Sequence, residues 1–165
     1  MQNQNIEINP AKYFDGKSNA IIFEYSFTVD VTDLDFLGHM NNANYMRYFE
    51  RARWDFINKQ GYGLEDAQKR QQSPILLETK IRFKRELRNR EVVTIFSQSK
   101  SVVGKMMTLN QVMVKSDGKI AAEADFIIGY FDMTNRKLMT PTDEWLHVIG
   151  FPVMEKHREV NRDLD

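Results

Sequence analysis

The chain contains no cysteine and only three histidines among its 165 residues. Without cysteine it has no disulfide framework, no thiolate metal site and no cysteine nucleophile. The histidines His39, His147 and His157 do not stand at the spacings that metal ligands show. We therefore expect neither a disulfide-stabilised scaffold nor a metal centre.

The sequence also lacks an excess of charge of either sign and any long apolar run. Lys and Arg number 23, as do Asp and Glu, which argues against a dedicated nucleic-acid-binding protein. The longest apolar runs, such as Phe126–Phe131, are far shorter than the roughly 20 residues that a membrane span needs. Residues 1–20 are polar and do not have the apolar stretch of a signal peptide. We expect a cytoplasmic protein without a membrane span.

The patterns that are present predict one α+β domain. A strand rich in β-branched and aromatic residues begins at Ile21, and a long amphipathic helix follows from Asn42, with apolar residues every three or four positions. Gly61–Gly63 ends this helix, and a short second helix is possible after it. Four more strands are predicted, over residues 74–87, 91–100, 105–115 and 119–133.

The remaining signals concern turns and chain ends. Ser116–Lys119 predicts a tight hairpin, and Thr140–Trp145 predicts a helix start with Pro141 at its first position. Residues 1–20 are expected to form a flexible arm, residues 21–152 the domain, and residues 153–165 a charged tail. One helix and five strands are best packed as an antiparallel curved sheet wrapped around the helix.

The densest polar cluster, Asp33–Tyr45, lies immediately before and at the start of the long helix. Asp33 and Asp35 point to the same side if the segment is extended, which suits acid–base chemistry, but aspartates also cap turns. Gly38 permits a positive φ, and His39 serves either as a base or as a structural hydrogen-bonding group. Both interpretations, catalytic and structural, remain open from spacing alone.

The position of the cluster suggests a chemical use for it as a unit. A helix N-terminus presents N–H groups without intrahelical acceptors and carries a partial positive charge. These groups can polarise a carbonyl and stabilise its oxyanion, while a carboxylate just upstream acts as nucleophile or general base. The hypothesis is an acyl-transfer site built against the core helix.

The same residues resemble a known family. The run Asp33-Leu-Asp-Phe-Leu-Gly-His-Met-Asn-Asn-Ala-Asn-Tyr45, followed by Glu50-Arg-Ala-Arg53, is similar to the motif of the hotdog-fold acyl thioesterases, in particular the 4-hydroxybenzoyl-CoA thioesterase-like branch. The resemblance covers approximately Phe23 to Phe151 and includes the order of the elements. It implies a hotdog fold and hydrolysis of an acyl thioester, most often acyl-CoA, without a cofactor.

The resemblance also implies roles for single residues. Asp35 matches the catalytic aspartate, and Asn42 stands where a backbone N–H holds the carbonyl oxygen. Asp33, Gly38 and His39 match motif positions with orienting or substrate-binding roles. Two further residues, Tyr45 in or beneath the acyl pocket and Lys105 at the CoA nucleotide, complete the predicted site.

The remaining expectations concern the substrate carrier and the oligomeric state of the protein. The substrate carrier is CoA or an acyl-carrier protein, and a non-catalytic acyl-thioester binding or scaffolding protein is the rival interpretation. The resemblance implies a homodimer or a dimer of dimers joined at sheet edges, and the alternating segment Glu91–Ser99 looks like an unprotected edge.

Overall fold

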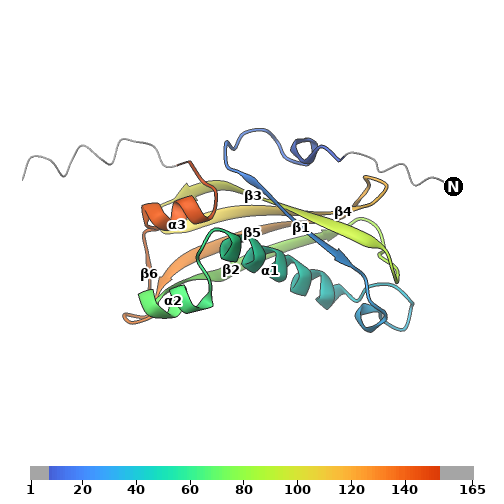
Figure 1. Cartoon of the computed structure of the whole chain (residues 1–165), viewed down its shortest axis with the longest axis horizontal. Helices are drawn as coiled ribbons and strands as arrows, with labels where there is room; N and C mark the ends of the chain where they lie inside the picture. Colours follow the sequence, from blue (N-terminus) through green and yellow to red (C-terminus); the bar gives the residue numbers. More distant parts are fainter. Residues whose placement is uncertain (1–7, 153–165) are drawn as a thin grey trace, which may run out of the picture.

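The structure is a computed structural model that describes residues 8–152. Its central element is the long helix α1 (Asn42–Lys59), as the sequence predicts (Figure 1). The Asn41 side chain caps it by accepting a hydrogen bond from the Ala43 N–H at 2.9 Å. Its buried stripe includes Tyr45, Phe49 and Phe56, as the apolar spacing predicts. This face packs against the sheet, where Phe49 meets Phe126 edge to face at 5.8 Å.

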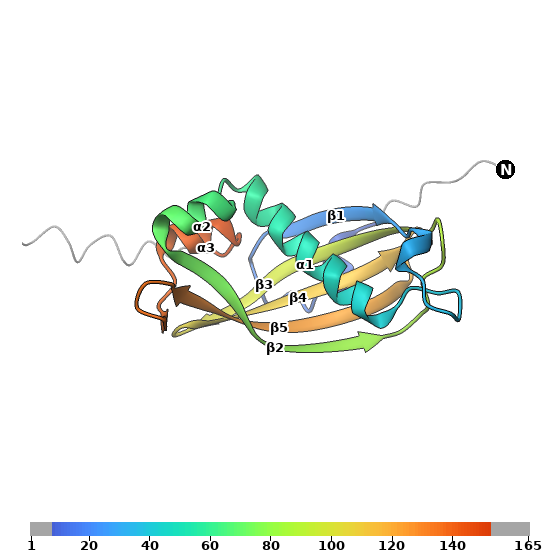
Figure 2. The same ribbon diagram turned by 90° about the horizontal axis from the view of Figure 1, so that it is seen from below.

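The sheet is antiparallel throughout and lies across one side of α1 (Figure 2). Its strands follow the spatial order β1-β3-β4-β5-β2. The short β6 pairs with the end of β5, an addition to the five predicted strands. The bounds are β1 (Ile22–Thr28), β2 (Gln72–Phe83), β3 (Val92–Val103), β4 (Met106–Lys115), β5 (Ile120–Asp132) and β6 (Lys137–Met139). The predicted arrangement, a curved sheet around one long helix, is confirmed.

Two short helices close one end of the molecule, beside the C-terminal end of α1 (Figure 1). They are α2 (Leu64–Arg70) and α3 (Asp143–Val148). Thr142 caps α3 through its hydroxyl, so Pro141 precedes the cap and does not occupy the first helical position. None of the helices within residues 8–152 is long and apolar enough to cross a membrane.

The segment before β1 packs on the face of the sheet opposite α1 (Figure 1). Its 3₁₀-helix (Pro10–Tyr13) brings the Tyr13 ring onto Phe96, with centroids 5.7 Å apart, and the Tyr13 hydroxyl donates to the Gly118 carbonyl at 3.0 Å. Ser18 adds a 2.6 Å hydrogen bond to the Ser99 carbonyl. The sequence predicts a flexible arm for residues 1–20; from residue 8 the structure shows this segment in contact with the sheet through aromatic stacking and hydrogen bonds. The tail predicted at 153–165 lies outside the described residues.

The edges of the sheet differ from the sequence prediction. Glu91–Ser99 falls largely in β3, which is paired with β1 on one side and β4 on the other. The edge strands are β1 and β2. The edge strand β2 carries exposed apolar residues, among them Leu76, Leu77 and Phe83. An alternating pattern is typical of any strand with two different faces, and so it did not identify the edge.

Candidate active site

The polar cluster before α1 folds into a small closed loop. Leu34 and Met40 pair as an isolated antiparallel bridge, and the Asp35 N–H donates to the His39 carbonyl at 2.9 Å. The Gly38 N–H returns a bond to the Asp35 carbonyl at 3.0 Å. Gly38 has φ +80°, a left-handed conformation that side chains disfavour, which explains why glycine stands there.

The two oxygens of the Asp35 carboxylate have different surroundings. Oδ1 accepts a hydrogen bond from the Leu37 N–H at 2.9 Å and thus holds the turn. Oδ2 lies 3.5 Å from His39 Nδ1, and the Asp35 side chain is 20% exposed. The turn-capping and catalytic interpretations are therefore compatible, because one oxygen remains available for chemistry.

The first turn of α1 begins at Asn42, a residue that shares a pocket with Asp35. The Ala43 N–H is taken by the Asn41 side chain, and the Asn44 N–H by the Asn41 carbonyl. The Asn42 N–H has no acceptor among residues 8–152. It is one of the orphan donors that every helix start presents.

Asp35 and Asn42 line one open pocket of about 430 Å³, which we call the Asp35 pocket. Tyr45 forms part of it: its ring meets Phe83 edge to face at 5.0 Å, and its hydroxyl donates to the Arg85 carbonyl. Burial raises the pKa of Tyr45 to about 12, so the phenol stays protonated at neutral pH. The full lining is Asp35, His39, Met40, Asn42, Tyr45, Phe83, Lys84, Arg85 and Glu86.

Asp33 lies beneath the loop and does not line this pocket. Its carboxylate is 1% exposed and accepts from Arg47 at 2.5 Å, from the Tyr48 hydroxyl at 2.7 Å and from the Asp30 N–H at 3.0 Å. Burial and the hydrogen bond to Asp33 both raise the pKa of the Tyr48 hydroxyl. The arrangement fits an orienting role for Asp33 and leaves no oxygen facing the pocket.

Lys105 is not brought to the Asp35 pocket of the same chain. It lies in the turn between β3 and β4, where its Nζ donates to the Leu138 carbonyl at 2.8 Å. The Lys105 carbonyl accepts a hydrogen bond from the Tyr130 N–H on β5. Phe83, which lines the Asp35 pocket, pairs with Ala122 on the same strand. Tyr130 and Ala122 are eight positions apart, about 26 Å along β5. A contact between Lys105 and the CoA nucleotide stays a prediction.

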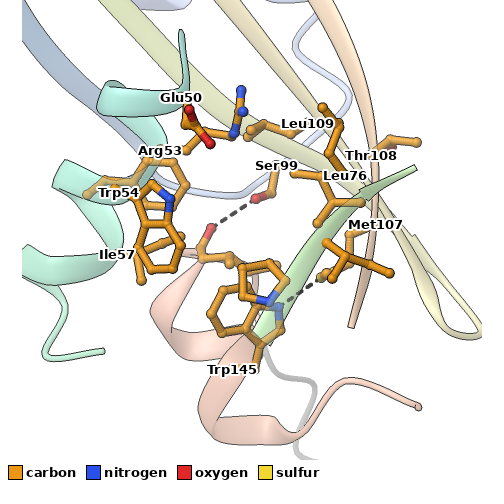
Figure 3. Close-up of a pocket in the computed structure, with 15 residues that line it drawn as sticks. Glu50, Arg53, Trp54, Ile57, Leu76, Ser99, Met107, Thr108, Leu109 and Trp145 are labelled. Atoms are coloured by element: carbon orange, nitrogen blue, oxygen red, sulfur yellow. Dashed lines mark hydrogen bonds between the residues drawn. The ribbon is translucent and has the colours of Figure 1, made fainter. Parts of the chain in front are cut away.

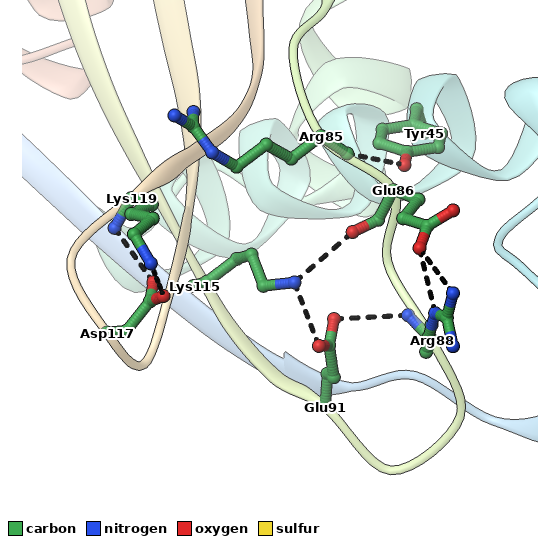
Figure 4. Close-up of polar contacts among 8 residues, drawn as sticks. All are labelled: Tyr45, Arg85, Glu86, Arg88, Glu91, Lys115, Asp117 and Lys119. Atoms are coloured by element: carbon green, nitrogen blue, oxygen red, sulfur yellow. Dashed lines mark hydrogen bonds and ion pairs between the residues drawn. The ribbon is translucent and has the colours of Figure 1, made fainter.

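The wall of the pocket beyond Tyr45 is a charged loop that the motif did not identify. Lys84 and Arg85 line the pocket, and Arg85 has no carboxylate within ion-pair distance among residues 8–152. Lys115 holds the loop by contacting the Glu86 carbonyl at 3.3 Å and the Glu91 carboxylate at 2.8 Å (Figure 4). The basic run in residues 80–90 is a sequence signal for this wall, although the strand pattern alone predicts only part of a strand there.

Comparison with known proteins assigns the chain to a class. Residues 29–149 match the family model described as the thioesterase-like superfamily. This segment includes the Asp33–Tyr45 cluster, α1 and β2–β5. The chain therefore belongs to the thioesterase-like superfamily.

Individual relatives agree with this membership. The chain is 28% identical over 113 residues to the long-chain acyl-CoA thioesterase FadM of Escherichia coli, an alignment that covers 64% of this chain and 80% of the relative. Among solved structures, a Staphylococcus aureus hypothetical protein in complex with CoA has a TM-score of 0.74 at 18% identity and covers 88% of this chain and 96% of its own. A probable thioesterase of Escherichia coli has a TM-score of 0.70 at 23% identity, with 78% and 96% covered. These structures confirm the hotdog fold.

Asp33→Asn tests the buried contact beneath the loop. The amide cannot satisfy Arg47, the Tyr48 hydroxyl and the Asp30 N–H together, so we expect the free energy of unfolding to fall by about 2 kcal/mol, less than for a fully buried ion pair because Arg47 is half-exposed. Thermal or urea unfolding measures this. The comparison variant is Asp35→Asn, because the Asp35 side chain is partly exposed. If Asp33→Asn loses no more stability than Asp35→Asn, a structural role for Asp33 is contradicted.

Proposed function

We propose that the protein hydrolyses an acyl thioester, most simply acyl-CoA, to the free acid and the thiol. The observation that carries this proposal is that Asp35 and Asn42 line one pocket, and that the Asn42 N–H has no acceptor within residues 8–152. The two groups have complementary tasks in acyl transfer, since one supplies electrons to a carbonyl carbon and the other stabilises its oxygen.

In the proposed reaction the thioester carbonyl oxygen accepts the Asn42 N–H. Negative charge that develops on this oxygen is stabilised by the N–H and by the positive end of α1, an 18-residue helix. Asp35 Oδ2 either attacks the carbonyl carbon, giving an anhydride that water then cleaves, or takes a proton from the attacking water. In both routes the carbon–sulfur bond breaks and the thiolate leaves and is protonated.

The other predicted residues support this arrangement. Gly38 permits the turn that places Asp35, and His39 stands within 3.5 Å of the carboxylate and orients it. Tyr45 contributes an apolar ring to the wall on which the substrate lies. The Asn42 side chain is not required, because the backbone is the proposed donor.

CoA is the favoured carrier. The relatives include proteins described as an acyl-CoA thioesterase and as a CoA complex, and Lys84 and Arg85 place positive charge at the pocket where a phosphate-bearing carrier would approach. The acyl-carrier-protein thioesterase and the non-catalytic binding protein are the alternatives. Release of thiol from a panel of acyl-CoA substrates separates an enzyme from a protein that only binds.

Asp35→Asn is the direct test of the mechanism. The amide fills the same space and still accepts from the Leu37 N–H, so folding and substrate affinity should persist. Turnover should fall by about 10² or more, the scale for losing a general base. Measurement of kcat, ligand affinity and melting temperature on the same preparations checks this.

The control for that experiment is Asp33→Asn, whose activity should follow its folded fraction. A folded Asp35→Asn protein that hydrolyses its best thioester at the wild-type rate would remove Asp35 from the mechanism.

Charge reversal at the rim tests how the carrier is held. Arg85→Glu should weaken the binding of CoA esters about tenfold more than the binding of short thioesters without a nucleotide. This difference should shrink as the salt concentration rises. Lys105→Glu is the companion variant, since the family resemblance predicts the same effect there, and Lys69→Glu on exposed α2 is the neutral control. Equal responses to both substrate types at Arg85 and at Lys105 would exclude both residues from nucleotide binding.

The exposed edge of β2 generates a prediction about assembly. Unpaired backbone groups together with Leu76, Leu77 and Phe83 favour pairing with a second chain, so we propose a homodimer or a dimer of dimers. Light scattering at micromolar concentration should give at least twice the chain mass of 19.4 kDa. A fully active monomer would be the contrary result.

A further inference from the structure

A second cavity, which we call the Arg53 cavity, lies beneath the C-terminal half of α1 (Figure 3). It has a volume of about 130 Å³ and opens between α1, β2, β4 and α3. Most of its wall is apolar, including Trp54, Ile57, Leu76, Met107, Leu109 and Trp145. Its lining shares α1 and β2 with the Asp35 pocket but has no residue in common with it.

Most polar groups on this wall are already engaged within the chain. The Ser99 hydroxyl donates to the Ile149 carbonyl, and the Trp145 indole N–H contacts Met107 Sδ at 2.9 Å (Figure 3). Thr108 is bonded to the Ser101 hydroxyl. Two side chains remain for a ligand, Arg53 and Glu50.

Arg53 is a buried cation without an ion-pair partner. It is 9% exposed, and no carboxylate lies within 4.0 Å of it in residues 8–152. One of its five N–H groups donates to Gln111 Oε1 at 2.9 Å, and the guanidinium lies over the Phe126 ring at 4.4 Å. Burial lowers the pKa of Arg53 to about 10, so the group is still protonated at neutral pH.

Burial of a charge in this way costs free energy of desolvation unless oxygen acceptors surround the charged group. Gln111 supplies a single acceptor, and its own amide is fixed by a bond to the Ser97 hydroxyl at 2.9 Å. The guanidinium nitrogens that remain are not sealed off from the cavity. The arrangement is a preformed donor at the side of an apolar cavity.

We propose that the Arg53 cavity binds the distal part of the acyl group and selects acyl groups that carry a hydroxyl there. This inference rests on the proposed thioester function and adds a substrate class to it. The hydroxyl oxygen accepts from Arg53 and its proton is donated to Glu50, while Trp54, Ile57 and Leu76 surround the neighbouring carbons.

The charge of the cavity decides between a hydroxyl and a carboxylate. A distal carboxylate would be attracted by Arg53 but repelled by Glu50, which lines the same cavity. A hydroxyl uses both groups, since it accepts and donates. The Arg53–Glu50 combination therefore favours a neutral polar group over an anion.

The dimensions agree with a distal subsite. Asn42 and Arg53 are eleven residues apart on α1, about 16 Å along the helix axis. A cavity of about 130 Å³ approaches the roughly 150 Å³ that accommodates a benzene molecule in an engineered core. It thus has room for the end of an acyl group and not for the whole of a long one.

Binding without hydrolysis tests the proposal directly. The probes are decanamide, 10-hydroxydecanamide and decanedioic acid monoamide, which differ only at the distal end and cannot be cleaved as thioesters. Calorimetry on the wild-type protein should show 10-hydroxydecanamide binding at least about tenfold more tightly than decanamide. Equal affinities, or no binding of either probe, would overturn the proposal.

Two variants assign the preference to its residues. Arg53→Met should abolish the hydroxyl preference, and a folded variant that keeps it contradicts the assignment. Because loss of Arg53 leaves Gln111 Oε1 buried without its donor and the variant can fail to fold, the exposed Glu50→Gln provides an independent test. It should bind the monoacid probe about tenfold more tightly than wild type while the hydroxyl preference falls. Unchanged ratios in Glu50→Gln would refute the proposal.

The matched control is Glu65→Gln, an exposed helical glutamate on α2 outside both pockets, which should bind all three probes as wild type does. The hydrolytic function is assayed separately with thioesters. If no thioester is cleaved but the hydroxyl preference and its loss in the variants persist, the proposed reaction fails and the ligand class stands. If thioesters are cleaved without any preference for a distal hydroxyl, the reaction stands and this inference fails.

Discussion

The buried Asp33 carboxylate is the contact on which the geometry of the candidate site depends. It joins the 3₁₀-turn at Asp30 to the first two turns of α1 through Arg47 and Tyr48. The Asp33 carbonyl adds bonds from the Asn41 N–H and the Asn44 side chain, both at 2.9 Å. A single residue therefore fixes the loop against the helix start, and as a consequence Asp35 and Asn42 line the same pocket.

The position of the polar cluster before the core helix now has a physical explanation. The apolar stripe of α1 must be buried against the sheet, so the helix is anchored along its length by Phe49 and its neighbours. The helix start reaches the end of the sheet, where the Asn42 N–H finds no acceptor among residues 8–152. The same burial that stabilises the fold thus holds an orphan donor rigidly at the surface, which is the preorganisation that oxyanion stabilisation requires.

Features that are local in sequence could be predicted, and features set by strand pairing could not. Asp35, Gly38, His39 and Asn42 lie within eight positions of one another, so their proximity followed from the turn and the helix start. Lys105 needed the registers of β4 and β5 before its distance from Phe83 was known.

Three other features could not be predicted from the sequence, because each depends on contacts that are distant in the chain or on the direction of a side chain. The edge of the sheet is a property of strand order, which the alternation in β3 does not encode. The packed segment at Tyr13 depends on Phe96 and Gly118, residues far from it in the chain. Arg53 was noticed only as part of a motif, because helical spacing does not reveal that a cation turns inward beside apolar residues.

In the proposed function, the two cavities give α1 two different electrostatic tasks, one at its start and one in its C-terminal half. At the start of the helix the proposed positive contribution comes from the backbone and would be directed at a charge that exists only during the reaction. Eleven residues later it comes from the Arg53 side chain, is permanent, and is balanced in part by Glu50. A permanent buried charge binds ground state and transition state alike, so it discriminates between substrates without accelerating the bond-breaking step. If both proposals hold, one amphipathic helix separates the chemistry of a thioester from the choice of its acyl group.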